Sequence, residues 1–366
     1  MCDMHDDAAK NRLGIKTIPV SEAVGMTLAH DVTEIRSGEF KGRAFRRGHI
    51  VRSEDICDLQ RLGKENLYVL NIGADEMHED EAAFRLASAL MGEGVEMQGN
   101  PKEGKINIVA SRDGLLKINK EALVNFNMNG DVMCATLHTN TCVKKGQIVA
   151  GTRAIPLVVN REIIEKAVFD AQRAVEVREM KKPRAGVVIT GNEVYFGRIK
   201  DAFASIIEKK VRHFNGEIAG IYYAPDDERM IEQRLRELID AGADMLITTG
   251  GMSVDPDDVT RFAIRNLGAV DMTYGSSVLP GAMFLVAYIS ANAQNSGVST
   301  GHNSASIPIL GIPACGMYHK NTVFDLILPR VLAGEKIGRR ELAALGHGGL
   351  CLNCPECRYP VCPFGK

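Results

Sequence analysis

The fold of the C-terminal half follows from residues 244–253, which read Asp244-Met245-Leu246-Ile247-Thr248-Thr249-Gly250-Gly251-Met252-Ser253. The apolar centre of this stretch is typical of a strand that is buried on both faces in a parallel sheet. Two threonines, two glycines and a serine follow the apolar centre, and glycine lets a backbone approach an oxyanion closely. We therefore predict a buried strand that ends in an anion-binding loop.

Strands and helices alternate on both sides of this stretch, from residue 185 to residue 333. Short apolar runs predict strands, and apolar residues spaced three or four apart predict helices. The alternation predicts an α/β fold, a three-layer sandwich with a mostly parallel sheet. The predicted strands are 185–190, 217–223, 244–248, 283–289 and 307–310, and the predicted helices are 201–214, 226–241, 256–267 and 318–332.

The first 182 residues indicate mixed α+β regions, including a basic loop or hairpin at 43–49. Predicted helices lie at 53–62, 80–92 and 161–179, and predicted strands at 67–70, 106–109, 131–136, 147–150 and 155–159. A chain of 366 residues suits two or three domains. We expect an N-terminal region at 1–100, a β-rich middle region at 101–182, the α/β domain at 183–338 and a Cys-rich tail at 339–366.

Composition argues against several classes of partner. The net charge of −2 creates no positive field for nucleic acid or anionic lipid. The polar, acidic first residues do not resemble a secretory signal. The longest apolar run, 282–291, is about half of the roughly 20 residues that a membrane span needs. We expect a cytoplasmic protein that binds neither nucleic acid nor membrane, and the sequence leaves open whether it forms a homo-oligomer.

Two predicted strands end in loops of glycine and small polar residues, at 190–193 and 248–253. Ligands of parallel sheets bind where strands end at their carboxyl edge. The next helix is expected to start at Asp255-Pro256, so its positive dipole end would face the same place. A phosphate is the expected ligand. A tight turn, with Asp255 and Asp258 only capping the helix, is the structural alternative.

Residues 185–335 resemble the molybdopterin-binding domain shared by MoeA, MogA and gephyrin proteins. The shared segments, in order, are Thr190-Gly191-Asn192-Glu193, Asp201, 243–254, Asp258-Val259-Thr260, Pro280-Gly281, Gly311-Ile312-Pro313, Phe324 and Pro329. Residues 19–32 also resemble the opening of MoeA proteins. The resemblance implies that the chain binds molybdopterin or the molybdenum cofactor, with an adenylylated form left open.

The resemblance also assigns roles to individual residues. In the family, the carboxylates matching Glu193 and Asp258 lie beside the pterin and metal-insertion site, so we expect them to be catalytic. Such a pair can position Mg²⁺ or exchange a proton with a dithiolene sulfur. The family's Gly-Gly-x-Ser loop holds the terminal phosphate. The residues expected to bind the cofactor are Thr190, Gly191, Asn192, Asp201, Thr249, Gly250, Gly251, Met252, Ser253, Pro280, Gly281 and Pro313.

The chain departs from the family pattern at several positions. Asp255 stands where the family usually has glycine, and Leu279 and Ala282 stand where it often has lysine. Residues 314–316 read Ala-Cys-Gly where the family has Gly-Asn-Pro. The Met-Asp-Gly-Tyr motif of molybdate-inserting MoeA proteins and their C-terminal β-barrel domain are not found in the sequence. We therefore expect a MoeA-related protein with a Cys-rich tail in which binding is better supported than metal insertion.

Three functions follow from these observations. The first is a transferase of cofactor biosynthesis or maturation, similar to a molybdopterin molybdotransferase, that inserts molybdenum or transfers an adenylyl group. The second is a non-catalytic carrier or sensor of the molybdenum cofactor that docks a molybdoenzyme client. The third, a metal-dependent phosphoesterase, is disfavoured because no His/Asp cluster of the two-metal type occurs in the sequence.

The tail carries four cysteines with the spacing Cys-x2-Cys-x2-Cys-x4-Cys. In a reducing cytosol, such a cluster favours a metal site over a disulfide framework. Four thiolates can hold zinc, and two successive x2 spacings also resemble part of an iron–sulfur run. We predict zinc or an iron–sulfur cluster at Cys351, Cys354, Cys357 and Cys362, with His347 as an alternative ligand.

Overall fold

The computed structural model describes residues 15–36, 40–70, 72–252, 258–290 and 306–366. Two compact units make up the chain, Met1–Val177 and Arg178–Lys366. Ser253, Asp255 and Pro256, which the sequence places in the anion-binding loop and at the start of the next helix, lie outside the described residues. None of the helices in the described ranges is long and apolar enough to cross a membrane.

A six-stranded sheet with the order β15-β14-β16-β19-β18-β17 forms the centre of the second unit. Neighbouring strands from β15 to β19 are parallel, whereas β18 is antiparallel to both β19 and β17. The predicted α/β fold with a mostly parallel sheet is therefore confirmed. The strands are β14 Arg184–Thr190, β15 Glu217–Ala224, β16 Met245–Thr249, β17 Val270–Tyr274, β18 Leu285–Ser290 and β19 Ser306–Ile312.

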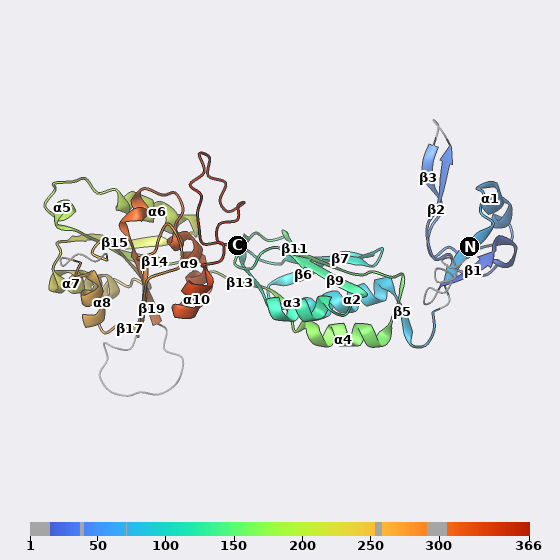
Figure 1. Cartoon of the computed structure of the whole chain (residues 1–366), viewed down its shortest axis with the longest axis horizontal. Coiled ribbons are helices and arrows are strands. Elements are labelled where there is room, and N and C mark those ends of the chain that lie inside the picture. Colours follow the sequence, from blue (N-terminus) through green and yellow to red (C-terminus); the bar gives the residue numbers. More distant parts are fainter. Residues whose placement is uncertain (1–14, 37–39, 71, 253–257, 291–305) are drawn as a thin grey trace, which may run out of the picture. The chain divides into compact units, whose positions relative to one another are not determined.

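Helices cover both faces of this sheet and complete a three-layer sandwich (Figure 1). Because successive side chains of a strand point to opposite faces, each strand contributes to two cores. On β16, Met245 and Ile247 pack with α6 and α9, whereas Leu246 packs with α7 and α8. The helices are α5 Asn192–Tyr195, α6 Phe203–His213, α7 Glu228–Asp240, α8 Thr260–Asn266, α9 Val323–Leu332 and α10 Arg339–Ala344, with a 3-10 helix η2 at Ala314–Met317.

Several helix boundaries correct the sequence-based prediction, including the start of the predicted helix 318–332, which begins at Val323. The predicted helix 161–179 ends at Ala171, because Gln172 and Arg173 adopt left-handed φ angles of 43° and 52°. The residues after this turn form strand β13 instead of continuing the helix. Helix α8 spans Thr260–Asn266, so Asp258 precedes the helix and its N-cap residue. These boundaries do not support the alternative in which Asp258 serves only in a capping box.

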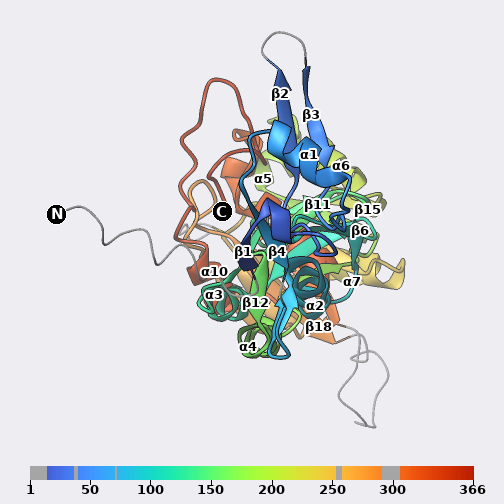
Figure 2. The ribbon, with the colours of Figure 1, turned by 90° about the vertical axis from the view of Figure 1, so that its right-hand side faces the viewer.

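An N-terminal region of the first unit packs around a small core that includes Leu28, Leu59 and Val69. Strands β1 and β4 pair antiparallel, as do β2 and β3. Figure 2 shows β2 and β3 as a ribbon that extends from the region containing α1. The elements are β1 Ile15–Pro19, η1 Val20–Glu22, β2 Val32–Arg36, β3 Phe40–Phe45, α1 Asp55–Arg61 and β4 Asn66–Leu70.

The rest of the first unit is a four-stranded antiparallel sheet, β6-β7-β11-β9, with helices packed against it. Helix α2 contacts both α4 and β11, and α3 contacts α4. The mixed α+β character predicted for this half is confirmed. The elements are β5 Glu76–His78, α2 Glu79–Leu90, β6 Val95–Lys102, β7 Lys105–Ala110, β8 Gly114–Ile118, α3 Lys120–Asn127, β9 Val132–Thr136, β10 Cys142–Val143, β11 Ile148–Ala154, β12 Val158–Asn160, α4 Arg161–Ala171 and β13 Val175–Arg178.

Candidate anion-binding site at the strand ends

Three buried threonines join the two predicted loops at the carboxyl edge of the second unit's sheet. Thr190, the last residue of β14, donates a hydrogen bond from its hydroxyl to the carbonyl of Thr249, over 2.6 Å. The same hydroxyl lies 3.3 Å from the hydroxyl of Thr260, the first residue of α8. We call Thr190, Thr249 and Thr260 the threonine cluster. It holds both strand-end loops and the start of α8 together.

The two residues after β16 must be glycine for steric reasons. Gly250 and Gly251 adopt φ angles of 77° and 58°, a conformation that other residues rarely take. A Cβ on Gly250 would lie 2.6 Å from the carbonyl oxygen of Thr190. A Cβ on Gly251 would press against the hydroxyl of Thr260. The loop can therefore follow its path across the threonine cluster only with glycine at both positions.

Met252 anchors the far end of the same loop. Its side chain is buried and fills the space above Gly311, where a Cβ would collide with the methionine sulfur. The hydroxyl of Tyr274 donates a hydrogen bond to the Met252 carbonyl. Tyr274 ends β17, a strand that the sequence analysis did not predict, and no motif marks this residue. The loop is thus held by a tyrosine that lies 22 residues further along the chain.

The loop after β14 is tied to the loop after β15. The backbone N–H of Asn192 donates to the Asp226 carboxylate over 3.0 Å, and the N–H of Asp226 donates to the Asn192 side-chain oxygen over 3.3 Å. Asp226 is a third acidic residue near a strand end, and the sequence analysis did not select it. Its position shortly after the predicted strand 217–223 is the sequence feature that could have identified it. The Asp201 carboxylate accepts hydrogen bonds from the N–H groups of Phe203 and Ala204, and so orders the start of α6.

The two predicted catalytic carboxylates lie next to the threonine cluster along the chain. Glu193 is exposed in α5, three residues after Thr190. Its carboxylate folds back over Gly191, where an added Cβ would lie 2.8 Å from Oε1. Asp258 is half-buried, two residues before Thr260. Both carboxylates therefore belong to loops that the cluster holds in place.

The Pro280-Gly281 loop packs on α9. The carbonyl of Pro280 accepts a hydrogen bond from the N–H of Val323 over 3.2 Å, and the side chain of Val323 leaves no space for a Cβ on Gly281. Pro313 is buried directly after β19, and its carbonyl accepts from the N–H of Gly316. The structure thus places Pro280 and Gly281 in the loop between β17 and β18, and Pro313 directly after the carboxyl end of β19.

The Cys-rich tail packs on the second unit beside the Pro280-Gly281 loop. The N–H of Cys351 donates to the carbonyl of Leu279 over 2.8 Å, and the N–H of Leu279 donates to the carbonyl of Gly349 over 2.9 Å. Phe364 is buried in the core that also contains α9. These contacts make the tail an ordered part of the second unit.

The four tail cysteines do not converge on a metal site in this structure. Cys354 and Cys357 are exposed, and Cys351 and Cys362 are half-buried. In the described part of the chain, no three His, Cys, Asp or Glu side chains are placed to hold a metal ion. The Cys357 sulfur instead accepts a hydrogen bond from the Asn321 amide. The metal site stays a prediction that rests on cysteine spacing alone.

The metal prediction is tested by elemental analysis and an absorption spectrum of protein purified without chelators. We expect zinc or iron bound to the thiolates, and the Cys354→Ser/Cys357→Ser double variant should lose most of it. Cys57→Ser is the matched control, because Cys57 is an exposed thiol outside the tail. Zinc without a visible band would exclude an iron–sulfur cluster. Metal-free protein that takes up neither metal would contradict the prediction.

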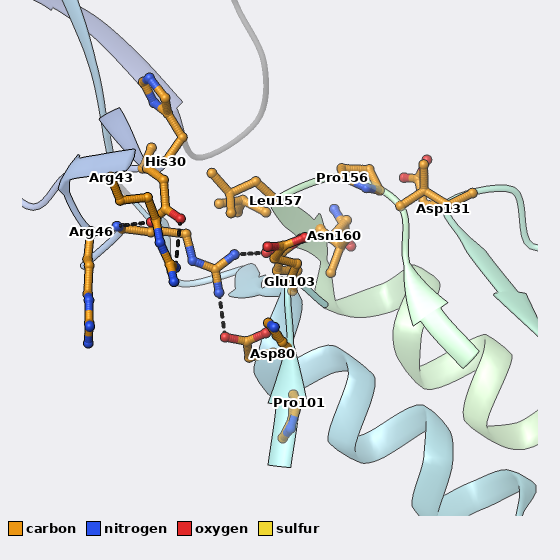
Figure 3. A pocket seen from close by; sticks show the side chains of 18 residues that line it. His30, Arg43, Arg46, Asp80, Pro101, Glu103, Asp131, Pro156, Leu157 and Asn160 are labelled. Atoms are coloured by element: carbon orange, nitrogen blue, oxygen red, sulfur yellow. Dashed lines mark hydrogen bonds and ion pairs between the residues drawn. The ribbon is translucent and has the colours of Figure 1, made fainter. Parts of the chain in front are cut away.

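A charged pocket of about 950 Å³ lies in the first unit (Figure 3). Arg47 forms an ion pair with the buried Glu79 and donates a hydrogen bond to Asp80 over 2.5 Å. Arg43 pairs with Asp31 over 3.0 Å. Both arginines come from the basic stretch 43–49, but nothing in the sequence indicated their acidic partners. The arginines thereby neutralise much of the acidic charge in the pocket.

A histidine in this pocket adds no positive charge at neutral pH. Burial, and then the positive charge of Lys64, lower the pKa of His30 below its usual range. The neutral imidazole is therefore the dominant form at pH 7. The charge balance of the pocket accordingly depends on its arginines, lysine and carboxylates.

The fold and the strand-end loops define a class of α/β ligand-binding domain, and comparison with known families identifies it. Residues 186–333 match the family model described as "Probable molybdopterin binding domain". This part of the chain is therefore similar to the molybdopterin-binding domain family. Residues 17–71 match a second model, described as "Domain of unknown function (DUF8806)".

Curated relatives match over a short stretch. The CinA-like protein of Mycobacterium avium (strain 104) is 40% identical over 89 residues, which is 23% of this chain and 20% of that protein. The CinA-like protein of Mycolicibacterium gilvum (strain PYR-GCK) is 38% identical over 89 residues, 23% of this chain and 21% of that protein. The chain thus spans about a fifth of the length of the curated relatives it matches.

Solved structures with similar elements include three examples. The tungsten cofactor synthesizing protein MoaB from Pyrococcus furiosus is 18% identical, with a TM-score of 0.30, over 41% of this chain and 90% of its own. CinA from Thermoplasma acidophilum is 14% identical, with a TM-score of 0.30, over 38% of this chain and 94% of its own. The Mog protein from Mycobacterium ulcerans is 14% identical, with a TM-score of 0.30, over 41% of this chain and 92% of its own.

Proposed function

We propose that this protein binds the pyranopterin phosphate of molybdopterin or of the molybdenum cofactor, bare or adenylylated, and acts in cofactor biosynthesis or maturation in the cytoplasm. The observation that carries the proposal is the threonine cluster with the two glycines packed on it. Within the described residues, the hydroxyls of Thr248 and Thr249 are buried without any hydrogen-bond partner. Buried polar groups are normally paired, so these hydroxyls support a polar ligand near the loop.

The residues of the site would divide the work as follows. The Thr249–Met252 loop would hold the phosphate, because glycine lets its backbone come close to an oxyanion. Glu193, exposed over Gly191, would accept or return a proton, and together with Asp258 it could position Mg²⁺. When bound, the pterin supplies the dithiolene sulfurs that hold molybdenum.

The proposal is tested by pterin analysis of the purified protein. We expect a fluorescent pterin that carries its phosphate, either retained through purification or taken up when it is offered. Retention is expected because buried donors without protein partners gain hydrogen bonds from the phosphate. The proposal is overturned if the protein neither retains nor takes up this ligand.

A turnover assay of the wild type and of the Glu193→Gln variant distinguishes an enzyme from a carrier. If the protein turns over adenylylated molybdopterin with molybdate, loss of this proton acceptor should lower turnover by about 10²–10⁴-fold and leave pterin binding unchanged. Glu217→Gln is the matched control, because Glu217 is an exposed acid that starts β15 at the opposite edge of the sheet. Unchanged turnover in Glu193→Gln would remove the catalytic assignment.

A carrier or sensor that docks a molybdoenzyme client is the second candidate, and one observation favours it. Leu350, Leu352 and Val361 in the tail expose 64%, 74% and 85% of their surfaces. Exposed apolar residues grouped in one segment are a common feature of docking surfaces. Cofactor binding without turnover, followed by transfer of the cofactor to an apo-molybdoenzyme, would support this function.

A further inference from the structure

Arg261 has a guanidinium group with unused hydrogen-bond donors. Its Nε atom is buried, and neither a hydrogen bond nor an ion pair reaches this side chain in the described ranges of the chain. The guanidinium carbon lies 5.1 Å from the ring centre of Tyr274 and 5.6 Å from that of Phe262. Aromatic faces hold an arginine in place without using its five N–H donors. The side chain is therefore held by aromatic contacts while its N–H donors are not used by other protein groups among the described residues.

The same contacts connect Arg261 to the Gly-Gly loop. Arg261 directly follows Thr260, whose hydroxyl belongs to the threonine cluster and limits the space at Gly251. The ring that Arg261 stacks against belongs to Tyr274, whose hydroxyl holds the carbonyl of Met252. Two independent contacts thus fix the arginine relative to the Gly250–Met252 loop.

Arg261 is also a cation that pairs with no carboxylate within the described residues. Residues 190–193 and 249–252 contain no lysine or arginine, and Leu279 and Ala282 flank Pro280-Gly281. Lys210 is paired with Asp325, and Arg339 donates to the carbonyls of Tyr274 and Gly275. A phosphate carries about −1.5 to −2 charges at pH 7. A cation beside the phosphate would offset its repulsion from the exposed carboxylate of Glu193.

We propose that Arg261 binds the anionic end of the ligand, donating charge-assisted hydrogen bonds from its guanidinium to phosphate oxygens at the Thr249–Met252 loop. The inference rests on the proposed function and deepens it, because it names the residue that selects a phosphorylated pterin over an unphosphorylated one. A planar guanidinium can bind two phosphate oxygens through two parallel hydrogen bonds, a geometry that a lysine ammonium does not offer. Binding through this residue should also weaken as salt concentration rises.

The test measures binding of pyrophosphate, of the pterin phosphate and of the dephosphorylated pterin by calorimetry. Arg261→Gln should weaken binding of both phosphate compounds about tenfold or more and leave the dephosphorylated pterin unaffected. Arg261→Lys keeps the positive charge, so this variant should retain part of the affinity for the phosphate compounds. Retained affinity would also show that substitution at this position does not unfold the protein. Arg265→Gln is the matched control, because Arg265 lies in the same helix and faces the same Phe262 ring at 6.0 Å.

The outcomes separate this inference from the proposed function. The inference is overturned if the Arg261→Gln variant binds pyrophosphate as tightly as the wild type and has the same melting temperature. This holds even if the wild type binds the pterin. Pyrophosphate binding that depends on Arg261, without binding of either pterin, supports the inference and overturns the proposed function. Wild-type protein that binds none of the three compounds overturns both.

Discussion

Gly251→Asp is expected to weaken binding of the pterin phosphate by at least about 100-fold, equivalent to about 2.7 kcal/mol. At a φ of 58°, a side chain costs about 1–2 kcal/mol in backbone strain alone. The new Cβ would also displace the hydroxyl of Thr260 from the threonine cluster. The added carboxylate would then repel the phosphate. Fluorescence titration with the pterin phosphate measures the loss.

Gly268→Asp is the matched control for this experiment. Gly268 has a φ of 88°, but a Cβ there would have no atom within 4 Å. The same glycine-to-aspartate change therefore introduces strain and charge in the second unit without touching the strand-end loops. We expect near-wild-type pterin affinity in this variant. Equal affinities of both variants and the wild type would show that the Gly-Gly loop does not contact the ligand.

Arg47→Met is expected to destabilise the first unit by about 3 kcal/mol, because it leaves the buried carboxylate of Glu79 without its cation. The Glu79 side chain is only 6% exposed, so water cannot replace the arginine effectively. Asp80 keeps a hydrogen bond from the N–H of Gly104 and depends less on Arg47. The free energy of unfolding from urea titration, followed by circular dichroism, measures the effect.

Two further variants check the cause. Arg43→Met removes an ion pair whose arginine is 56% exposed, and should cost less than about 1 kcal/mol. Combining Arg47→Met with Glu79→Leu removes both buried charges and should recover much of the lost stability. An Arg47→Met variant as stable as the wild type would mean that solvent reaches Glu79 in solution. If the double variant is no more stable than Arg47→Met, the loss of stability comes from altered packing and not from an unpaired charge.

The core pattern explains why most strands of the second unit could be predicted. A parallel strand covered on both faces needs an uninterrupted apolar run, and Met245, Leu246 and Ile247 provide one to two separate cores. Because parallel strands share one carboxyl edge, two strand-end loops distant in sequence were expected to meet. The hydrogen bond between Thr190 and Thr249 shows that they do.

Residues outside motifs could not be found in the same way. Tyr274 and Arg261 reach the site through long side chains from elements whose own sequences show no ligand-binding pattern. Asp226 follows a strand end, but a lone acid after a strand is more often a solvated loop residue. The prediction that the helix continues to residue 179 was wrong for a different reason. The left-handed turn at Gln172 and Arg173 ends it, and neither residue is one that typically signals such a turn.

By itself, the sequence determined the α/β order of residues 185–333, the glycines at the strand ends and the class of ligand expected there. These properties are local, because apolar periodicity and the backbone freedom of glycine act within a few residues. Only the tertiary structure decided which hydroxyls of the described residues remain unpaired and that Arg261 stacks on Tyr274 near the Gly-Gly loop. These properties depend on contacts between residues far apart in sequence, which the folded core brings together. The Gly-Gly loop shows both contributions, since its glycines can be recognised in the sequence, whereas the position of Arg261 near the loop depends on the fold.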